Sequence, residues 1–517
     1  MTPLPLQPPP RKLVRADKHV PFPAAISVHG LDDAAPAEQR TRETMTALGA
    51  QLPEVPFDFG GGAPYRITFR HEPAVGHAEG YTLSSDEGGI TVAARTAAGR
   101  FYGAQTVYQL LTHAYHGARF GRFNHAVSAR AAAARRAVPV LRIEDEPRFA
   151  QRGFMVDSGR APWSPALLRR LIRIMAHLKL NLLHLHLIDD ELCGFRFARL
   201  PLGAENPYAL TADDLRELVA YARSYHVAVM PEIESWGHVN SIVYHYPHLR
   251  GTAGQYGGSS FGVGEATYAL IDKILDEIVP CLEDTAAVHL GLDEALWAVL
   301  PGEENRGHTP ENMVGRLHGI LMRVGARHAK DLTMHVWADH GGRPLPVELR
   351  EKIVVQPWGY HAQGIPAIIE QVRNYGGAGQ PPVMLGGGAS WIRCHGDFEA
   401  TRVWAREAQA HPNVLGITLC LWGTNDLAGR LITLYGGAGF IWTPPDATED
   451  AETPAAVELR RNTLDQQMRQ WQILFPDADP GAINTDRGPE VELGRYVWPP
   501  RAGEAVAPTV EHFPDES

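Results

Sequence analysis

The stretch RGFMVDSGRAPWSPALLRRLIRIMAHLKLNLLHLHLIDD (residues 152–190) contains the pattern that decides the fold. A short apolar run at 153–157 is followed by apolar residues at helical spacing, and a second apolar run occupies 181–187. Ser164 directly precedes the helical segment 165–178 and is a suitable N-cap. Short apolar runs that alternate with helices are typical of parallel strands joined by crossover helices. The stretch therefore predicts a strand, a helix and a second strand beside the first.

The same alternation continues along the chain. A second helix is predicted at 212–225, after the N-cap Thr211. Further strands are predicted at 227–231, 287–292, 334–337, 353–357, 383–386 and 417–422. Eight such units predict an α/β fold, a (β/α)8 TIM barrel, over residues 148–445. A doubly wound sheet is the second choice, because no Gly-rich phosphate loop accompanies the strands.

The segments on either side of the barrel have a different character. Strand-like runs at 65–70 and 90–94 and a helical pattern at 99–111 predict a small α+β domain over residues 1–147. Residues 446–517 predict one polar helix at 455–474, followed by a proline-rich, mobile tail.

Composition narrows the class of protein. The chain has 517 residues, of which 44% are hydrophobic and 21% charged, with a formal charge of -11. Basic residues form only short clusters, so we expect no nucleic-acid partner. No apolar run approaches about 18 residues, and the N-terminus has no signal peptide core, so we expect no membrane partner and a cytoplasmic protein. The four cysteines lack CxxC spacing, which indicates free thiols. The sequence leaves a homodimer open.

Polar side chains follow the predicted strands at their carboxyl ends, where TIM barrels place their chemistry. Aromatic rings stack on the apolar faces of a pyranose, while carboxylates and arginine bind its hydroxyl groups. The set therefore predicts a carbohydrate site. Its members are Asp157, Arg160, Asp189, Asp190, Glu232, Glu234, His238, Asp293, Glu294, Trp337, Trp358 and Trp422.

Several of these residues have simpler explanations. A single carboxylate is more often a helix cap or a surface ion pair, and a single tryptophan more often belongs to the core. His184 and His186 alternate on one predicted strand and could bind a metal, but we favour packed, hydrogen-bonded histidines and expect no metal or cofactor. Asp293 and Glu294 are adjacent, and close carboxylates raise at least one pKa, which suits a proton donor near neutral pH.

Several segments resemble one family, in the same order. VHLGLDE (288–294) resembles the His-x-Gly-Gly-Asp-Glu signature of family 20 glycoside hydrolases, the β-N-acetylhexosaminidases. EGYTL (79–83) and GRFYGAQTVYQLL (99–111) resemble the small domain that precedes the barrel of this family. Four further segments resemble the family's motifs at the first, second, third and last strands of its barrel. They are RGFMVDSGR (152–160), LHLHLIDD (183–190), PEIESWGH (231–238) and LCLWG (419–423).

The resemblance implies an exo-acting, retaining β-N-acetylhexosaminidase that releases terminal GlcNAc or GalNAc from an amino-sugar glycan by substrate-assisted hydrolysis. Glu294 would protonate the glycosidic oxygen. Asp293 would orient the 2-acetamido group, whose carbonyl oxygen attacks the anomeric carbon. Asp189 and His238 would form a hydrogen-bonded chain to Glu294, and Arg160 would bind ring hydroxyls.

The resemblance also implies that Trp337, Trp358 and Trp422 form walls around the acetamide and the sugar ring. Two other functions stay open: a catalytically silent carbohydrate-binding barrel, and a metal-dependent barrel hydrolase that uses His184 and His186.

Three positions depart from the family pattern. Leu292 replaces the second glycine of the signature, and the family's Trp-x-Glu reads Trp-Gly-Thr here, ending at Thr424. Asn425 or Asp426 would then have to supply the missing contact to the outer hydroxyls. The segment 388–397 lacks the family's Tyr-Leu-Asp, so the acetamide-binding tyrosine needs a substitute. The candidates are Tyr360, Trp391 and His395.

Overall fold

The computed structural model describes residues 4–120, 136–253, 259–338, 345, 347–360, 382–390, 398–446 and 453–487. Its N-terminal part is a seven-stranded mixed sheet in the order β1-β7-β5-β6-β4-β2-β3. The strands are β1 (Lys12–Pro21), β2 (Ile26–His29), β3 (Phe57–Phe59), β4 (Tyr65–His71), β5 (Tyr81–Asp86), β6 (Gly89–Ala94) and β7 (Ala137–Asp145). The predicted α+β domain and its two predicted strands, now β4 and β6, are confirmed.

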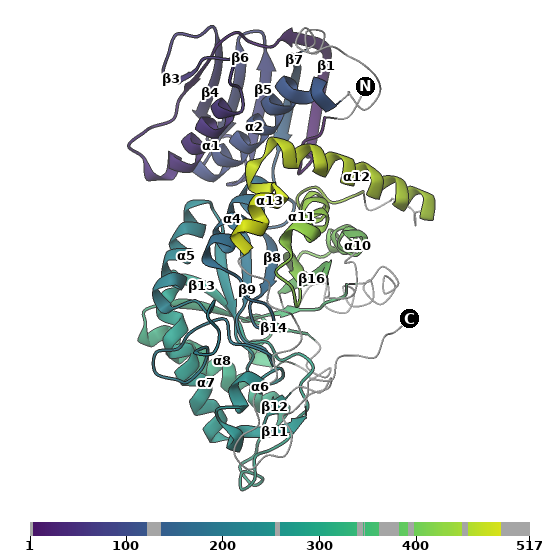
Figure 1. Cartoon of the computed structure of the whole chain (residues 1–517). Helices are drawn as coiled ribbons and strands as arrows, with labels where there is room; N and C mark the ends of the chain where they lie inside the picture. Colours follow the sequence, from purple (N-terminus) through teal and green to yellow (C-terminus); the bar gives the residue numbers. More distant parts are fainter. Residues whose placement is uncertain are drawn as a thin grey trace.

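Two helices, α1 (Gln39–Ala50) and α2 (Ala97–Phe120), lie along this sheet (Figure 1). The helix predicted at 99–111 is the middle of α2, which extends further at both ends. Its residues at helical spacing, Phe101, Val107 and Leu111 among them, are buried. Burial of this apolar face holds the helix on the sheet.

Eight parallel strands form a closed barrel in the order β10-β13-β14-β15-β16-β17-β8-β9 (Figure 1). This confirms the predicted TIM barrel. The strands are β8 (Gln151–Asp157), β9 (Leu182–His186), β10 (Ala228–Glu232), β13 (Thr285–His289), β14 (Asp331–Trp337), β15 (Ile353–Gln356), β16 (Val383–Ser390) and β17 (Val414–Leu421).

One barrel strand ends earlier than predicted. The apolar pattern predicts a strand at 287–292, whereas β13 ends at His289. Gly291 and Leu292 have φ angles of +62° and +80°, which turn the chain out of the extended conformation. The apolar pattern does not reveal where the φ angle becomes positive, so the predicted strand extends three residues beyond the end of β13.

Helices surround the barrel and begin where the sequence indicates. Ser164 accepts a hydrogen bond from the Leu167 amide at the start of α4, and Thr211 forms a capping box with Asp214 at the start of α5. The helices are α4 (Pro165–His177), α5 (Ala212–Ser224), α6 (Asn240–Val243), α7 (Glu265–Ile278), α8 (Pro310–Arg327), α10 (Phe398–Ala408) and α11 (Leu427–Trp442). A short hairpin of β11 (Arg250–Ala253) and β12 (Ser259–Phe261) precedes α7.

The C-terminal segment returns to the junction of the two domains. The predicted helix at 455–474 is α12 (Pro454–Leu474), which contacts α2 and α11 (Figure 1). A further helix, α13 (Pro480–Arg487), occupies the start of the predicted tail and packs on α4. The rest of the predicted mobile tail lies outside the described residues. No helix in the described part of the chain is long and apolar enough to cross a membrane.

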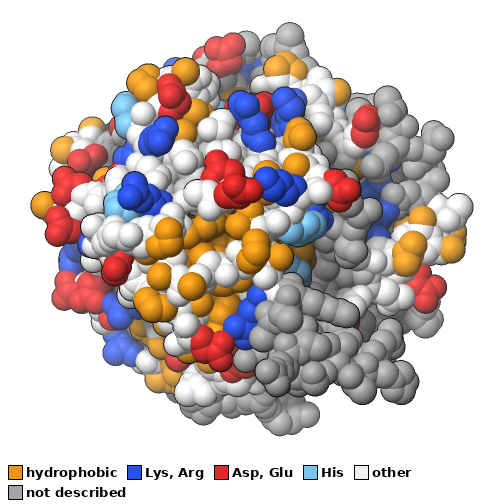
Figure 2. All heavy atoms as spheres, turned by 90° about the horizontal axis from the view of Figure 1, so that it is seen from above, with side chains coloured by type: hydrophobic (Ala, Val, Ile, Leu, Met, Phe, Trp, Pro, Cys, Tyr) orange, Lys and Arg blue, Asp and Glu red, His pale blue; other side chains and the backbone are white. Residues whose placement is uncertain are grey.

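Acidic and basic side chains are interspersed on the face of the N-terminal domain that Figure 2 shows. Apolar side chains lie between the charged ones on this face. A mixed surface of this kind produces no strong field of one sign across the face.

Candidate active site

Arg160 lies among carboxylates at the carboxyl ends of β8 and β9. Its guanidinium contacts Asp157 (Nη1 to Oδ2, 3.1 Å), Asp189 (Nη2 to Oδ2, 2.8 Å) and Glu191 (Nε to Oε2, 3.5 Å). Burial opposes the charge on Arg160, but Asp189, Asp157 and Glu191 raise its pKa well above the usual value. Its side chain is 10% exposed, so the charge can still reach a bound ligand.

His238 connects this arginine site to the two adjacent acids after β13. Its Nε2 lies 3.2 Å from Oε2 of Glu294 and 3.7 Å from Oδ2 of Asp293. Its Nδ1 lies 3.3 Å from Oδ2 of Asp190 and 3.5 Å from Oδ1 of Asp189. Burial alone would lower the pKa of His238, but Asp189, Asp190 and Glu294 raise it well above the usual value. The resulting imidazolium can donate a hydrogen bond from both nitrogens.

Close backbone packing brings His238 to the acids. A Cβ atom on Gly237 would lie 2.4 Å from the Asp293 carbonyl oxygen, so only glycine permits this approach of the loops after β10 and β13. His238, Leu292 and Glu294 have φ angles of +51°, +80° and +48°. Non-glycine residues in this region cost of order 1 kcal/mol each and persist where the surrounding structure holds them, often at active sites.

Glu234 is a buried acid beneath the signature segment. Its side chain is fully buried, and neither carboxyl oxygen has a hydrogen-bond partner within the described residues. A Cβ atom on Gly291 would lie 2.0 Å from its Oε2, which explains the glycine at this left-handed position. Burial, together with the nearby Asp293 and Glu232, raises the pKa of Glu234 well above its usual value. This side chain is therefore held as the neutral acid at neutral pH.

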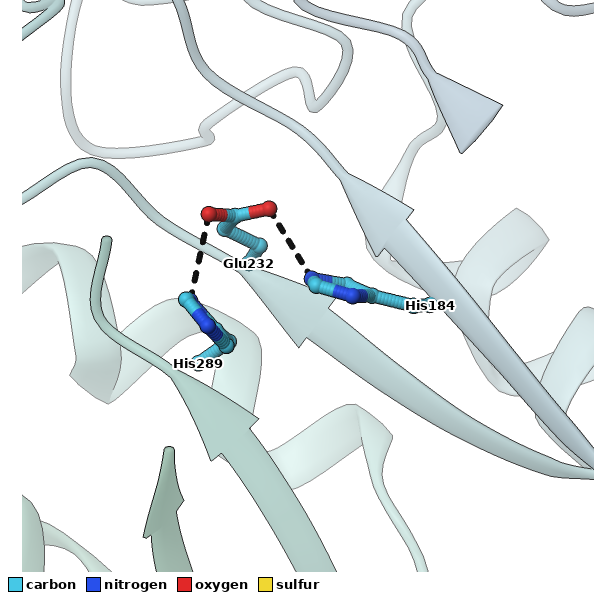
Figure 3. Close-up of side chains that lie close together, drawn as sticks. All are labelled: His184, Glu232 and His289. Atoms are coloured by element: carbon cyan, nitrogen blue, oxygen red, sulfur yellow. Dashed lines mark ion pairs between the residues drawn. The ribbon is translucent and has the colours of Figure 1, made fainter. Parts of the chain in front are cut away.

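Glu232 forms the floor of the site. Its carboxylate lies between His184 (Nε2, 2.9 Å) and His289 (Nδ1, 3.1 Å), as Figure 3 shows, and 2.7 Å from Nδ1 of His186. The Trp337 indole also donates a hydrogen bond to it. Burial alone would raise the pKa of Glu232, but the three histidines lower it well below the usual value. These side chains surround the carboxylate and join four neighbouring barrel strands, although the contacts of His184 and His186 with its Oε2 lack hydrogen-bond geometry.

The His184, Glu232 and His289 group also has ligand types that suit a metal. However, its nitrogen-to-oxygen distances of 2.9 and 3.1 Å are those of hydrogen-bonded or ion-paired groups. His184 and His186 are packed as we favour, and His186 Nε2 lies 2.8 Å from Oδ2 of Asp189, but neither ring nitrogen of His184 has a hydrogen-bond partner within the described residues. Burial lowers the pKa of His184 to about 4, so this imidazole is neutral at neutral pH.

The three predicted tryptophans lie together. Trp337 and Trp422 are buried, with ring centroids 5.7 Å apart, and half-buried Trp358 stacks on Tyr360 at 5.5 Å. The Tyr360 hydroxyl interacts with the side chains of Trp422 and Cys420. Burial, Cys420 and Asp293 raise its pKa well above the usual value, so Tyr360 keeps its proton. These side chains form an aromatic cluster that includes one hydroxyl group.

Asp426, another predicted substrate contact, has a structural role. The Asp426 carboxylate accepts a hydrogen bond from the Gly429 amide and caps α11. Trp391 and His395 lie outside the described residues. The prediction that Asp189 and His238 form a chain to Glu294 agrees with the distances, although Asp190, which sequence reasoning left without a role, lies nearer to His238 than Asp189 does. Its only signal was its position next to Asp189 at the strand end.

Comparisons with known proteins give matches for both domains. Residues 4–146 match domain 2 of Glycosyl hydrolase family 20, and residues 149–361 match the catalytic domain of that family. The β-hexosaminidase of Porphyromonas gingivalis is 30% identical over 237 residues, which cover 42% of this chain and 29% of that protein. The β-N-acetylhexosaminidase of Cellulomonas fimi is 29% identical over 262 residues, covering 46% of this chain and 48% of that protein. The matched segments thus span less than half of these relatives.

Solved structures show the same fold. The family 20 β-N-acetylhexosaminidase of Streptomyces coelicolor has a TM-score of 0.64 and 23% identity, and the match covers 92% of this chain and 97% of that one. At this level of identity the comparison supports the two-domain architecture. The ordered motifs, the two matched domains and the arrangement of the strand ends lead to one conclusion: the chain belongs to glycosyl hydrolase family 20.

Proposed function

We propose that the protein is an exo-acting, retaining β-N-acetylhexosaminidase that uses substrate-assisted hydrolysis. The observation that carries this proposal is the contact of one imidazole, His238, with both Glu294 and Asp293. The same mouth of the barrel holds Arg160, which suits sugar hydroxyls, and the aromatic cluster, which suits an acetamide.

Glu294 donates a proton to the glycosidic oxygen as the bond to the anomeric carbon breaks. The carbonyl oxygen of the substrate's 2-acetamido group forms the new bond to that carbon and gives an oxazolinium ion. Asp293 orients the acetamide nitrogen and stabilises its developing positive charge. Water then opens the ring, and Glu294 takes the water proton. His238 stabilises the carboxylate form of Glu294 between these steps.

The aromatic cluster contributes to orientation. Trp337, Trp358 and Trp422 surround the acetamide, and the Tyr360 hydroxyl donates to its carbonyl oxygen. Tyr360 then takes the place of the tyrosine that the segment 388–397 lacks. Because an internal nucleophile held in position has a high effective molarity, the enzyme needs no nucleophile of its own.

The test is hydrolysis of chromogenic N-acetyl-β-D-glucosaminide and N-acetyl-β-D-galactosaminide. We expect release from at least one of them and inhibition by a thiazoline that mimics the oxazolinium ion. No release from either would leave a silent carbohydrate-binding barrel. Release unaffected by the thiazoline would reject substrate assistance. Activity that a chelator abolishes and zinc restores would favour the metal-dependent alternative.

We further propose a cytoplasmic location. Cys193, Cys281 and Cys420 are buried free thiols, which suits a reducing compartment. Fractionation of the native source tests this, since recovery with extracellular proteins would contradict it.

A further inference from the structure

The short strand β12 lies beside α6, at the end of the molecule away from the N-terminal domain (Figure 1). All three of its residues are buried. It makes hydrogen bonds to the turns after β9, β10 and β13, and these turns carry Asp190, His238 and Glu294. β12 is therefore placed to fix the three turns relative to one another.

The main chain of Ser259, the first residue of β12, binds the histidine side of this group. Its amide donates to Oδ1 of Asp190 at 3.2 Å, and its carbonyl oxygen accepts from the Val239 amide at 3.0 Å. Val239 directly follows His238, whose Nδ1 lies 3.3 Å from the other carboxyl oxygen of Asp190. Backbone hydrogen bonds of one residue thus fix both Asp190 and the position next to His238.

The side chain of Ser260 binds the other side of the group. Ser260 is fully buried, and its Oγ accepts a hydrogen bond from the Leu296 amide at 3.3 Å. The Leu296 carbonyl accepts from Oγ1 of Thr252, in the paired strand β11, also at 3.3 Å. Both backbone groups of Leu296 are thus bound by hydroxyl groups of the β11–β12 hairpin. Because Leu296 is two residues beyond Glu294, the hairpin holds the segment that carries the acid.

The backbone of Glu294 needs support of this kind. Its φ of +48° lies in the left-handed region, which a residue other than glycine adopts at a cost and keeps where the surrounding structure holds it. Strand β13 ends five residues earlier, at His289. A general acid must also lie within hydrogen-bond reach of the atom that it protonates. The bonds at Leu296 therefore act on the place where Glu294 is presented.

We propose that Ser260 is a positioning residue for the proton donor: through Leu296 it keeps Glu294 beside His238 and aimed at the glycosidic oxygen. Without the Ser260 hydroxyl, the segment loses the bond at the Leu296 amide, and Glu294 can relax towards an ordinary backbone conformation. A displacement of about 1 Å at a reacting group can cost about 10²-fold in rate. This inference rests on the proposed function, in which Glu294 is the proton donor.

The test compares two aryl glycosides of the N-acetylhexosamine that wild type prefers, a phenyl and a dinitrophenyl glycoside. Phenolate is a poor leaving group and needs a proton from the enzyme, whereas dinitrophenolate leaves without one. We expect Ser260→Ala to lower kcat/KM on the phenyl glycoside about 10- to 100-fold. On the dinitrophenyl glycoside kcat/KM should stay near the wild-type value. This ratio of the two values responds to the proton donor and not to a general loss of active protein.

Thr267→Val is the matched control. Thr267 is also fully buried, and its Oγ1 donates to the carbonyl of Gly262, the residue after β12, at 2.6 Å. The variant therefore removes a buried hydroxyl bond at the same hairpin without touching Leu296. We expect it to keep the wild-type ratio of the two kcat/KM values, even where its melting temperature falls.

An equal loss on both glycosides in Ser260→Ala, or no loss on either, would overturn the inference, while an active wild type preserves the proposed function. If Ser260→Ala does not fold, Ser260→Cys gives the same comparison, because a thiol fills the space of the hydroxyl and is a weak acceptor. Wild type that is inactive on both glycosides would remove both proposals together.

Discussion

The two ends of strand β8 carry two arginines in opposite settings. Arg152, at the end that faces the N-terminal domain, is fully buried and lies over Trp442, with Cζ 5.0 Å from the ring centroid. Its partners are Glu79 at 2.8 Å and the Lys179 carbonyl at 2.8 Å. Arg160, at the other end, lies over Trp422 at 5.3 Å and remains partly exposed among acids that outnumber it.

The difference separates stability from function within one barrel. At the domain junction each charge has its partner: Lys179 contacts Asp145 and Tyr81 at 2.8 Å, and Trp442 donates to Asp145 at 2.9 Å. At the carboxyl ends of the strands, acids gather, and three non-glycine residues have left-handed backbone conformations. TIM barrels place catalysis at the carboxyl ends of their strands and stability at the opposite face. The largest mutational effects on activity and on folding should therefore fall at different ends.

The strongest way to break this comparison is Glu294→Gln. We expect kcat to fall by about 10³-fold, because general acid catalysis supplies roughly 10²- to 10⁴-fold. The unfolding transition should remain close to that of wild type. Glu265→Gln, which removes an exposed ion pair with Arg316, is the control and should keep full activity. Near-normal turnover in Glu294→Gln would place the proton donor elsewhere.

At the junction, Asp145→Asn should act on folding instead. It removes the counter-charge of the buried Lys179, and breaking one partner of a buried pair costs about 3–5 kcal/mol. Burial already lowers the pKa of Lys179 against the effect of Asp145. We expect a large drop in the free energy of unfolding, measured with urea, and normal kcat/KM per folded molecule. A loss of activity larger than the loss of folded protein would contradict the separation.

Leu292 allows a finer test at the carboxyl ends of the strands. We expect Leu292→Gly to be more stable than Leu292→Ala by about 1 kcal/mol, because only glycine adopts φ of +80° without strain. The matched control is Leu290, which is equally buried and is not among the residues with positive φ. There alanine should be the more stable of the two replacements. The same order at both positions in urea unfolding would show that strain at Leu292 is negligible.

The smallest effect near neutral pH concerns His177, which is buried at the junction and stacks on Phe475 with ring centroids 3.9 Å apart. Burial, with a contribution from Lys179, lowers its pKa to about 3. Between that value and the ordinary pKa of about 6.5, the unfolded chain binds a proton that the folded chain does not. Stability should therefore fall as pH falls through this window, by about 1.4 kcal/mol at pH 5.5.

His177→Gln should reduce the loss of stability as the pH falls. Glutamine can still reach the amide of Gln105, whose Oε1 contacts His177 Nδ1 at 2.8 Å. The measurement is the melting temperature from pH 7.5 to 4.5 for both proteins. Parallel curves would assign the acid sensitivity to other groups.

The sequence predicted those features that depend on local pattern. Buried parallel strands are short apolar runs, so all eight barrel strands were predicted. The edge strand β1 was not, since most of its side chains are exposed and no alternation marks it. Asp426 has the same local signature as a substrate ligand and as a helix cap, and only the fold shows that it caps α11.

The candidate site likewise has features that the sequence predicts and features that only the fold reveals. Asp293, Glu294 and Arg160 could be chosen because strand ends converge in a barrel. The nearer approach of Asp190 than Asp189 to His238 depends on the turn after β9, which no spacing rule describes. Nor does the sequence show the left-handed backbone at His238 or the contact of Gly237 with the next loop.

The pairing of Arg152 with Glu79 has a consequence for how this chain can be cut or recombined. Glu79 belongs to the N-terminal domain and Arg152 to the first barrel strand, and Asp145 and Lys179 repeat the exchange across the junction. A barrel excised at its first strand would carry two buried cations whose counter-ions had been left behind. The two domains therefore have to be kept together. A chimera with a foreign N-terminal domain needs an acid at the positions of Glu79 and Asp145.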